Sequence, residues 1–133
     1  MVSEKITNQK GFLAYFKRFF KAVFWSNKLN LTLVLLSLFF NLTSWILLAV
    51  FIKRSEFPVP LHYNIYFGID LTGPYRNIFN LPSIGLFVVV INFVLGFWFY
   101  SKDRIISYIL LLVSLVVQIF VLIGAVTVIF INQ

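Results

Sequence analysis

Residues 105–131 read IISYILLLVSLVVQIFVLIGAVTVIFI, an unbroken apolar run without a charged side chain. A helix needs about 20 predominantly apolar residues to cross the roughly 30 Å hydrocarbon core of a bilayer. This run meets that requirement and leaves room for some tilt. It therefore predicts a membrane-spanning helix.

Two earlier segments have the same character, PSIGLFVVVINFVLGFWFY at 82–100 and LNLTLVLLSLFFNLTSWILLAVFI at 29–52. Only SKDR, residues 101–104, separates the second apolar segment from the third. A connection this short predicts a tight turn between antiparallel helices. Pro82 suits the first turn of a helix, where its missing N–H has no partner to lose.

The composition agrees with a membrane protein. The 133 residues are 61% hydrophobic and only 11% charged, against about 25% charged in ordinary soluble domains. A soluble chain of this length has too much surface to hide so much apolar area. The net charge of +7 lies beside the apolar runs, as membrane-flanking lysines do, so we expect no nucleic-acid partner. The absence of cysteine excludes disulfides and thiolate metal sites.

Residues 1–28 are predicted to be a cytoplasmic N-terminus with an amphipathic helix over 10–25. Basic side chains recur on one side of this helix and phenylalanines on the other. Such a helix lies in the headgroup plane and binds anionic lipids. The alternative is a helix that packs on a partner protein through its phenylalanine face. The predicted membrane-surface residues are Lys10, Lys17, Arg18, Lys21 and Lys28.

The distribution of basic residues predicts the orientation. Eight of the eleven Lys and Arg residues lie in the N-terminal segment or in the 101–104 turn. The positive-inside rule then places both in the cytoplasm. The 53–81 loop and the C-terminus are expected to be extracytoplasmic, in the cytoplasmic (inner) membrane of a bacterium.

Small and polar residues recur at heptad-like spacing in each span. Small side chains let helix backbones approach, and amides form hydrogen bonds between helices. We interpret these residues as helix packing, with a polar substrate site as the alternative. The mid-span amides of Asn41, Asn92 and Gln118 could meet in one cluster, and Asn92→Leu would then loosen the packing. The packing residues are Ser37, Asn41 and Ser44, then Gly85, Asn92 and Gly96, and then Ser107, Ser114, Gln118 and Ala125.

The loop at 53–81 is too rich in aromatic residues to be disordered. We expect an ordered aromatic cap over the outer ends of the spans, in which residues 62–70 form a short strand or a turn-rich hook. His62 is the only histidine, and neither it nor Asp70 has an evident partner. No catalytic constellation, metal site or cofactor is therefore predicted.

The loop also carries a sequence pattern, formed by Pro60, His62, Asn64, Gly68 and Gly73 and followed by the Leu-Pro pair that ends at Pro82. This pattern resembles the membrane domain of unknown function found in Sdp-type bacterial immunity proteins. The spacing between Asn64 and Gly68 is longer than in that domain. The resemblance implies a bacterial membrane protein. From its own residues, including Asp70, which can bond its own backbone in a turn, we expect the loop to serve structure or recognition.

The sequence thus predicts an all-α integral membrane protein with an N-terminal interfacial helix, three transmembrane helices and a structured loop between the first two. We expect a non-catalytic protein that acts through protein–protein interaction, as an accessory or assembly subunit of a membrane complex or as a homo-oligomer. The alternative is an immunity- or sensor-like protein that recognises an extracytoplasmic ligand through residues 57–82.

Overall fold

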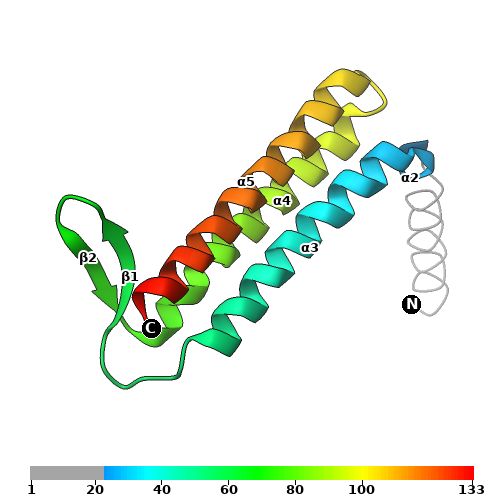
Figure 1. Cartoon of the computed structure of the whole chain (residues 1–133). Coiled ribbons are helices and arrows are strands. Elements are labelled where there is room, and N and C mark those ends of the chain that lie inside the picture. The colour runs from blue at the N-terminus through cyan, green and yellow to red at the C-terminus, as the bar shows by residue number, and fades with distance from the viewer. Residues whose placement is uncertain (1–22) are drawn as a thin grey trace, which may run out of the picture.

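The computed structural model describes residues 23–133 and is mostly helical (Figure 1). Three long helices lie side by side, α3 (Lys28–Phe51), α4 (Asn80–Phe99) and α5 (Arg104–Ile131), and α4 runs antiparallel to the other two. A single helical turn, α2 (Val23–Ser26), precedes α3. The connection from α3 to α4 holds strands β1 (Val59–Asn64) and β2 (Gly68–Gly73) and the 3-10 helix η1 (Tyr75–Phe79).

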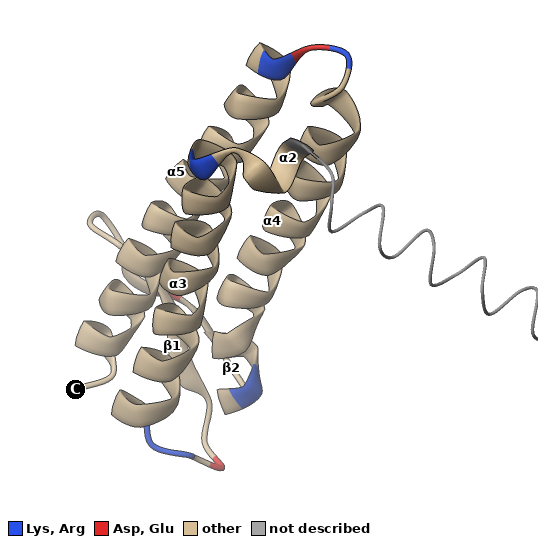
Figure 2. Ribbon diagram, turned by 90° about the vertical axis from the view of Figure 1, so that its right-hand side faces the viewer, with Lys and Arg blue, Asp and Glu red and all other residues tan. Residues whose placement is uncertain are grey.

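Within residues 23–133, three helical segments are long and apolar enough to cross a membrane. This confirms the three predicted spans, whose observed ends lie within two residues of the predicted ones. The described Lys and Arg residues lie near the two ends of the helices (Figure 2). By the length and composition of its helices, the chain is an integral membrane protein.

Side-chain caps set where two of the helices begin. The first N–H groups of a helix have no partner within it, and Asn or Asp at the N-cap can accept from them. Asn27 Oδ1 accepts from the backbone N–H of Leu29 at 2.9 Å. Asp103 Oδ1 accepts from the backbone N–H of Ile105 at 2.8 Å, so Asp103 caps α5 at the end of the tight turn after α4.

The faces that the helices turn toward one another carry the small and polar stripes. Ser37, Asn41 and Ser44 of α3 are buried, and so are Gly85 and Gly96 of α4. On α5 the buried positions with small or polar side chains are Ser107, Ser114, Gln118 and Ala125. Helix α5 packs along both α3 and α4. The stripes therefore form the interior of the bundle.

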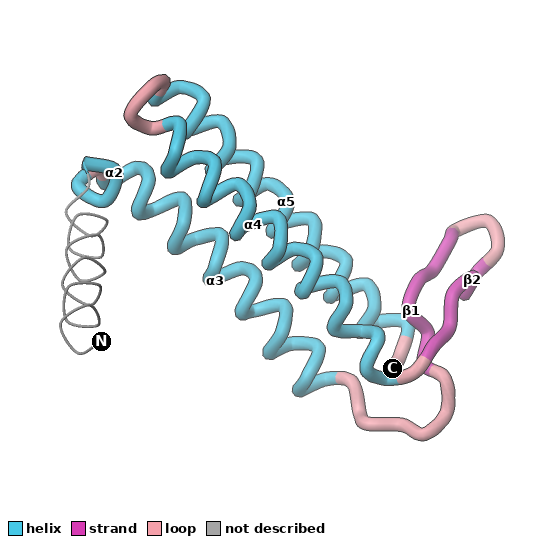
Figure 3. Tube along the Cα trace, turned by 180° about the vertical axis from the view of Figure 1, so that it is seen from behind, coloured by secondary structure: helices cyan, strands magenta, loops and turns pink. Residues whose placement is uncertain are grey.

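Strands β1 and β2 form an antiparallel hairpin, which corrects the all-α fold class and agrees with the short strand expected within residues 62–70. The side chain of Asn64 accepts from the N–H of Tyr66 at 2.9 Å, and Gly68 takes a φ of 74°, so both residues favour the turn. Two irregularities interrupt the register near His62. The hairpin projects sideways from the end of the bundle (Figures 1 and 3), and the expectation of a cap over all three helix ends is wrong in this respect.

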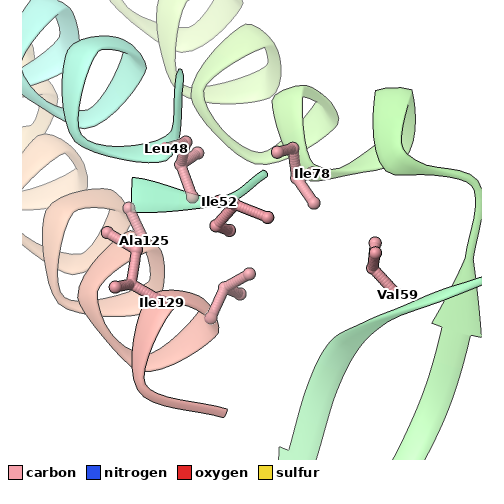
Figure 4. Packing of buried hydrophobic residues seen from close by; sticks show 7 residues of the cluster. Leu48, Ile52, Val59, Ile78, Ala125 and Ile129 are labelled. Atoms are coloured by element: carbon pink, nitrogen blue, oxygen red, sulfur yellow. The ribbon is translucent and has the colours of Figure 1, made fainter. Parts of the chain in front are cut away.

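A hydrophobic core ties the base of the hairpin to the helices (Figure 4). Val59 of β1 is buried in this core, together with Ile78 of η1. The side chain of Asn132 adds a polar link, because its Nδ2 donates to the carbonyl of Pro60 at 2.8 Å. The base of the hairpin is therefore fixed. The buried residues of the core are Leu48, Ile52, Val59, Ile78, Ala125, Val128 and Ile129.

A second core lies at the opposite end of the bundle, around Phe24 of α2. The ring of Phe24 makes edge-to-face contacts with Phe97 and Tyr100 at centroid distances of 5.3 Å. The predicted amphipathic helix at 10–25 lies outside the described residues except for its last three positions, which fall in α2. Of the predicted membrane-surface residues, Lys10, Lys17, Arg18 and Lys21 also lie outside the described part.

Candidate functional site

The most elaborate polar arrangement in the bundle joins all three long helices near the middle of α3. Asn41 Nδ2 donates to the carbonyl oxygen of Pro82 and to Gln118 Oε1, each at 2.9 Å. Gln118 Nε2 donates in turn to the carbonyl oxygen of Gly85 at 2.8 Å. We call these four residues the amide network. The exposed fractions of Asn41 and Gln118 are 3% and 0%.

Gly85 makes room for the network. A Cβ atom at this position would lie 3.0 Å from Gln118 Oε1 and 3.3 Å from Asn41 Nδ2. It would also lie 2.9 Å from Val121 Cγ2. Without a side chain, the backbone of α4 comes close enough for its carbonyl groups to serve as acceptors. The network thus depends on a close approach that glycine permits.

One atom of the network has no partner. Both bonds of Asn41 use Nδ2, and none of the described residues donates to Oδ1. Asn41 also lines an open groove of about 550 Å³ on the side of the bundle, between α3 and α4. We call this the lateral groove, and its other lining residues are Leu38, Leu42, Trp45 and Leu86. The groove is apolar apart from this one amide.

Asn92 does not join the predicted cluster of three amides. It is half-buried, and its side chain makes no hydrogen bond to any described residue. The hydroxyl groups of Ser37 and Ser44 donate to backbone carbonyls of their own helix, four residues earlier. The buried hydroxyl of Ser114 has no partner among the described residues. These positions serve close packing more than hydrogen bonding between helices.

A polar contact that the sequence analysis missed lies at the other end of the bundle. Asn27 Nδ2 donates to the hydroxyl groups of Tyr100 at 3.1 Å and Tyr108 at 2.9 Å. The same residue caps α3, so one side chain links the starts of α3 and α5 with the end of α4. The signal available in the sequence was an asparagine directly before an apolar run, which is a typical N-cap.

The predicted loop residues lie in or beside the hairpin. His62 Nδ1 and Asp70 Oδ1 are 2.7 Å apart, so the expectation that neither has a partner is wrong. Both side chains are partly exposed, at 63% and 35%. The register irregularity beside His62 leaves Asp70 without an opposite residue, and such bulges redirect side chains. Gly73 lies against Leu61 and Asn77.

A smaller groove of about 280 Å³ lies between the hairpin and the ends of α4 and α5. We call it the hairpin groove. His62 and Asn77 contribute polar groups to its lining, and Leu61, Leu81 and Val128 contribute apolar ones. Within residues 23–133, no three His, Cys, Asp or Glu side chains come together in a way that could hold a metal ion.

Comparison with known proteins adds no relative. No protein-family model matches the chain, and no match was found among curated proteins or solved structures.

Proposed function

We propose that the chain is a non-catalytic subunit of a membrane protein complex and that it binds its partner within the bilayer. The observation that carries this proposal is the open, apolar lateral groove, which includes Asn41 in its lining. The groove is open, apolar and long enough to involve two turns of α3, from Leu38 to Trp45. These properties suit a transmembrane helix of another protein.

The chemistry of the groove favours a helix with a hydrogen-bond donor. A polar group in hydrocarbon is costly when it is unpaired, since no water can reach it. Hydrogen bonds between transmembrane helices contribute about 0.6 kcal/mol on average and up to about 1.7 kcal/mol. A partner with Ser, Thr, Asn or Gln at the depth of Asn41 would satisfy Oδ1. Its apolar face would cover Leu42 and Leu86.

The orientation is part of the proposal. Lys28, Lys102 and Arg104 lie at the end of the bundle opposite the hairpin (Figure 2). The positive-inside rule supports a cytoplasmic location for that end in a bacterial inner membrane. The hairpin would then be extracytoplasmic.

Purification from mild detergent tests the proposed function. We expect the tagged chain to retain a fixed partner in constant ratio. Leu42→Trp should fill the lateral groove and reduce the retained partner severalfold. Leu36→Trp is the matched control, because residue 36 is exposed on the same helix but lies about 120° from residue 42 around its axis. A chain that purifies alone, or equal loss of partner in both variants, would contradict the proposal.

A second candidate function rests on the hairpin groove. A pocket of this volume suits part of a small ligand, and His62 and Asn77 could orient it. The sequence resemblance to Sdp-type immunity proteins supports recognition of an extracytoplasmic toxin or signal by this loop. The test is protection of cells that express the chain, and Asn77→Ala should abolish it while Leu42→Trp leaves it intact. If cells that express Asn77→Ala are protected as well as cells that express the parent chain, this candidate is wrong.

A further inference from the structure

The tip of the hairpin presents large apolar side chains that nothing in the described part of the chain covers. Ile65, Tyr66 and Phe67 are 78%, 83% and 81% exposed. Behind the tip, Tyr63, Ile69 and Leu71 are also exposed. A contiguous apolar surface of this kind marks contact with a partner or with lipid.

The hairpin brings no uncompensated charge to this surface. His62 and Asp70 are the only acid and base between Val59 and Gly73, and they contact each other across the strands at 2.7 Å. An ionised side chain without a partner would oppose contact with an apolar phase, because its desolvation is costly. The mutual contact lowers that cost for the hairpin.

The base of the hairpin lies at the membrane boundary. The hairpin leaves the bundle between the end of α3 at Phe51 and the start of α4 at Asn80. Arg54 and Arg76 line an open cleft beside its base together with one acidic residue, Glu56, and basic side chains at the ends of spans typically meet lipid headgroups. At this end Trp45 stacks on Phe79 with ring centroids 5.2 Å apart, as in the aromatic belts of membrane proteins.

The tip of the hairpin lies beside the helices and not over their ends. It projects sideways from the bundle in both views (Figures 1 and 3). Large apolar side chains of the bundle are also exposed near the same end, among them Phe51 and Phe130. The region beside a transmembrane bundle at this level holds the boundary between headgroups and acyl chains.

We propose that the hairpin is a membrane anchor whose tip, Ile65–Phe67, inserts into the leaflet nearest to it. The exposed apolar side chains of the bundle near the same end and the two arginines at the base of the hairpin favour lipid over a protein partner. Tyrosine suits this boundary because its ring is apolar and its hydroxyl is polar. The anchor would hold the hairpin flat beside the bundle. The proposal concerns a surface separate from the lateral groove and does not depend on the proposed function.

The test uses the absence of cysteine in the chain, which allows a single spin label at any introduced Cys. The full chain is reconstituted in vesicles of phosphatidylcholine and phosphatidylglycerol. Relaxation of the label by oxygen, which prefers lipid, is compared with relaxation by a polar nickel chelate. We expect Tyr66→Cys to give a severalfold higher ratio of oxygen to nickel accessibility than Ser101→Cys, which lies in the exposed turn at the other end.

A second variant shows whether the tip residues themselves are responsible. Replacing Ile65, Tyr66 and Phe67 by serine keeps the turn residues Asn64 and Gly68. In that background a label at Ile69→Cys should become more accessible to nickel than in the parent chain. Equal ratios at Tyr66→Cys and Ser101→Cys would overturn the proposal. So would dipolar broadening between labels of two copies, since the tip would then be a contact between chains.

Discussion

The close approach of α4 to its neighbours makes Gly85→Ala the most informative substitution in the bundle. The added methyl group would lie 2.9 Å from Val121 Cγ2, well inside the 3.5–4.0 Å at which carbon atoms attract. It would also meet Gln118 Oε1 at 3.0 Å. Helices α4 and α5 would have to separate, and the hydrogen bonds of the amide network would lengthen.

The expected cost of Gly85→Ala combines three effects. Overpacking of a buried site costs about 1–3 kcal/mol. Loss of the two bonds that Gln118 makes would cost about 0.6 kcal/mol each. Alanine favours the helix over glycine by about 1 kcal/mol and offsets part of this. We therefore expect the free energy of unfolding to fall by about 1–3 kcal/mol.

Gly96→Ala is the matched control on the same helix. Its Cβ would meet Ser107 Oγ at 3.5 Å and Leu111 at 3.6 Å, which are ordinary contacts. This variant should be neutral or up to about 1 kcal/mol more stable. Both variants can be measured by reversible unfolding in mixed micelles of dodecyl maltoside and dodecyl sulfate, followed by tryptophan fluorescence. Equal stability of the two variants would refute the role assigned to Gly85.

Substitutions at three other positions test the remaining polar side chains. Asn27→Ala should destabilise the bundle by about 1–2 kcal/mol, because it removes both the α3 cap and the tyrosine contacts. Asn27→Asp should cost less, because it keeps the cap and its second oxygen can accept from the tyrosine hydroxyls. The same micelle assay applies, and equal losses in the two variants would contradict this role of the cap. Asn92→Leu should leave the stability unchanged or raise it, because its amide makes no hydrogen bond to a described residue, and a loss above about 1 kcal/mol would indicate an unrecognised partner. Asp70→Asn should change the thermal midpoint little, since exposed ion pairs contribute about 0–1 kcal/mol, and a large shift would show that the pair with His62 organises the hairpin.

The spans were predictable because the bilayer imposes a simple physical rule. A segment such as 105–131 is long, apolar and uncharged, and a helix alone satisfies its backbone in lipid. The stripes were predictable for a related reason. Gly85, Gln118 and Asn41 each belong to a stripe of small or polar residues on their own helix, and the heptad-like spacing within each stripe is typical of helices that pack at a small angle. The hairpin was harder to predict. Its first strand contains Pro60 and directly follows Pro58, its strands show little alternation, and its turn places apolar side chains where a soluble protein would carry polar ones.

The polar contacts show where reasoning from sequence reaches its limit. Counting residues within each predicted span placed Asn41, Asn92 and Gln118 at a similar depth. The depth of one helix relative to another is not readable from the sequence, because Asn41 and Gln118 meet the first turns of α4, at the carbonyl groups of Pro82 and Gly85. Asn92 lies seven residues beyond Gly85, about 10 Å further along the axis of α4. The carbonyl partners on Pro82 and Gly85 carry no side-chain signal. The pair of His62 and Asp70 likewise depends on a register irregularity that redirects one residue. The hydrogen-bond partners of polar side chains in this protein are therefore set by how closely the backbones approach one another, which glycine and proline control. The spacing of the polar residues along the sequence matters less.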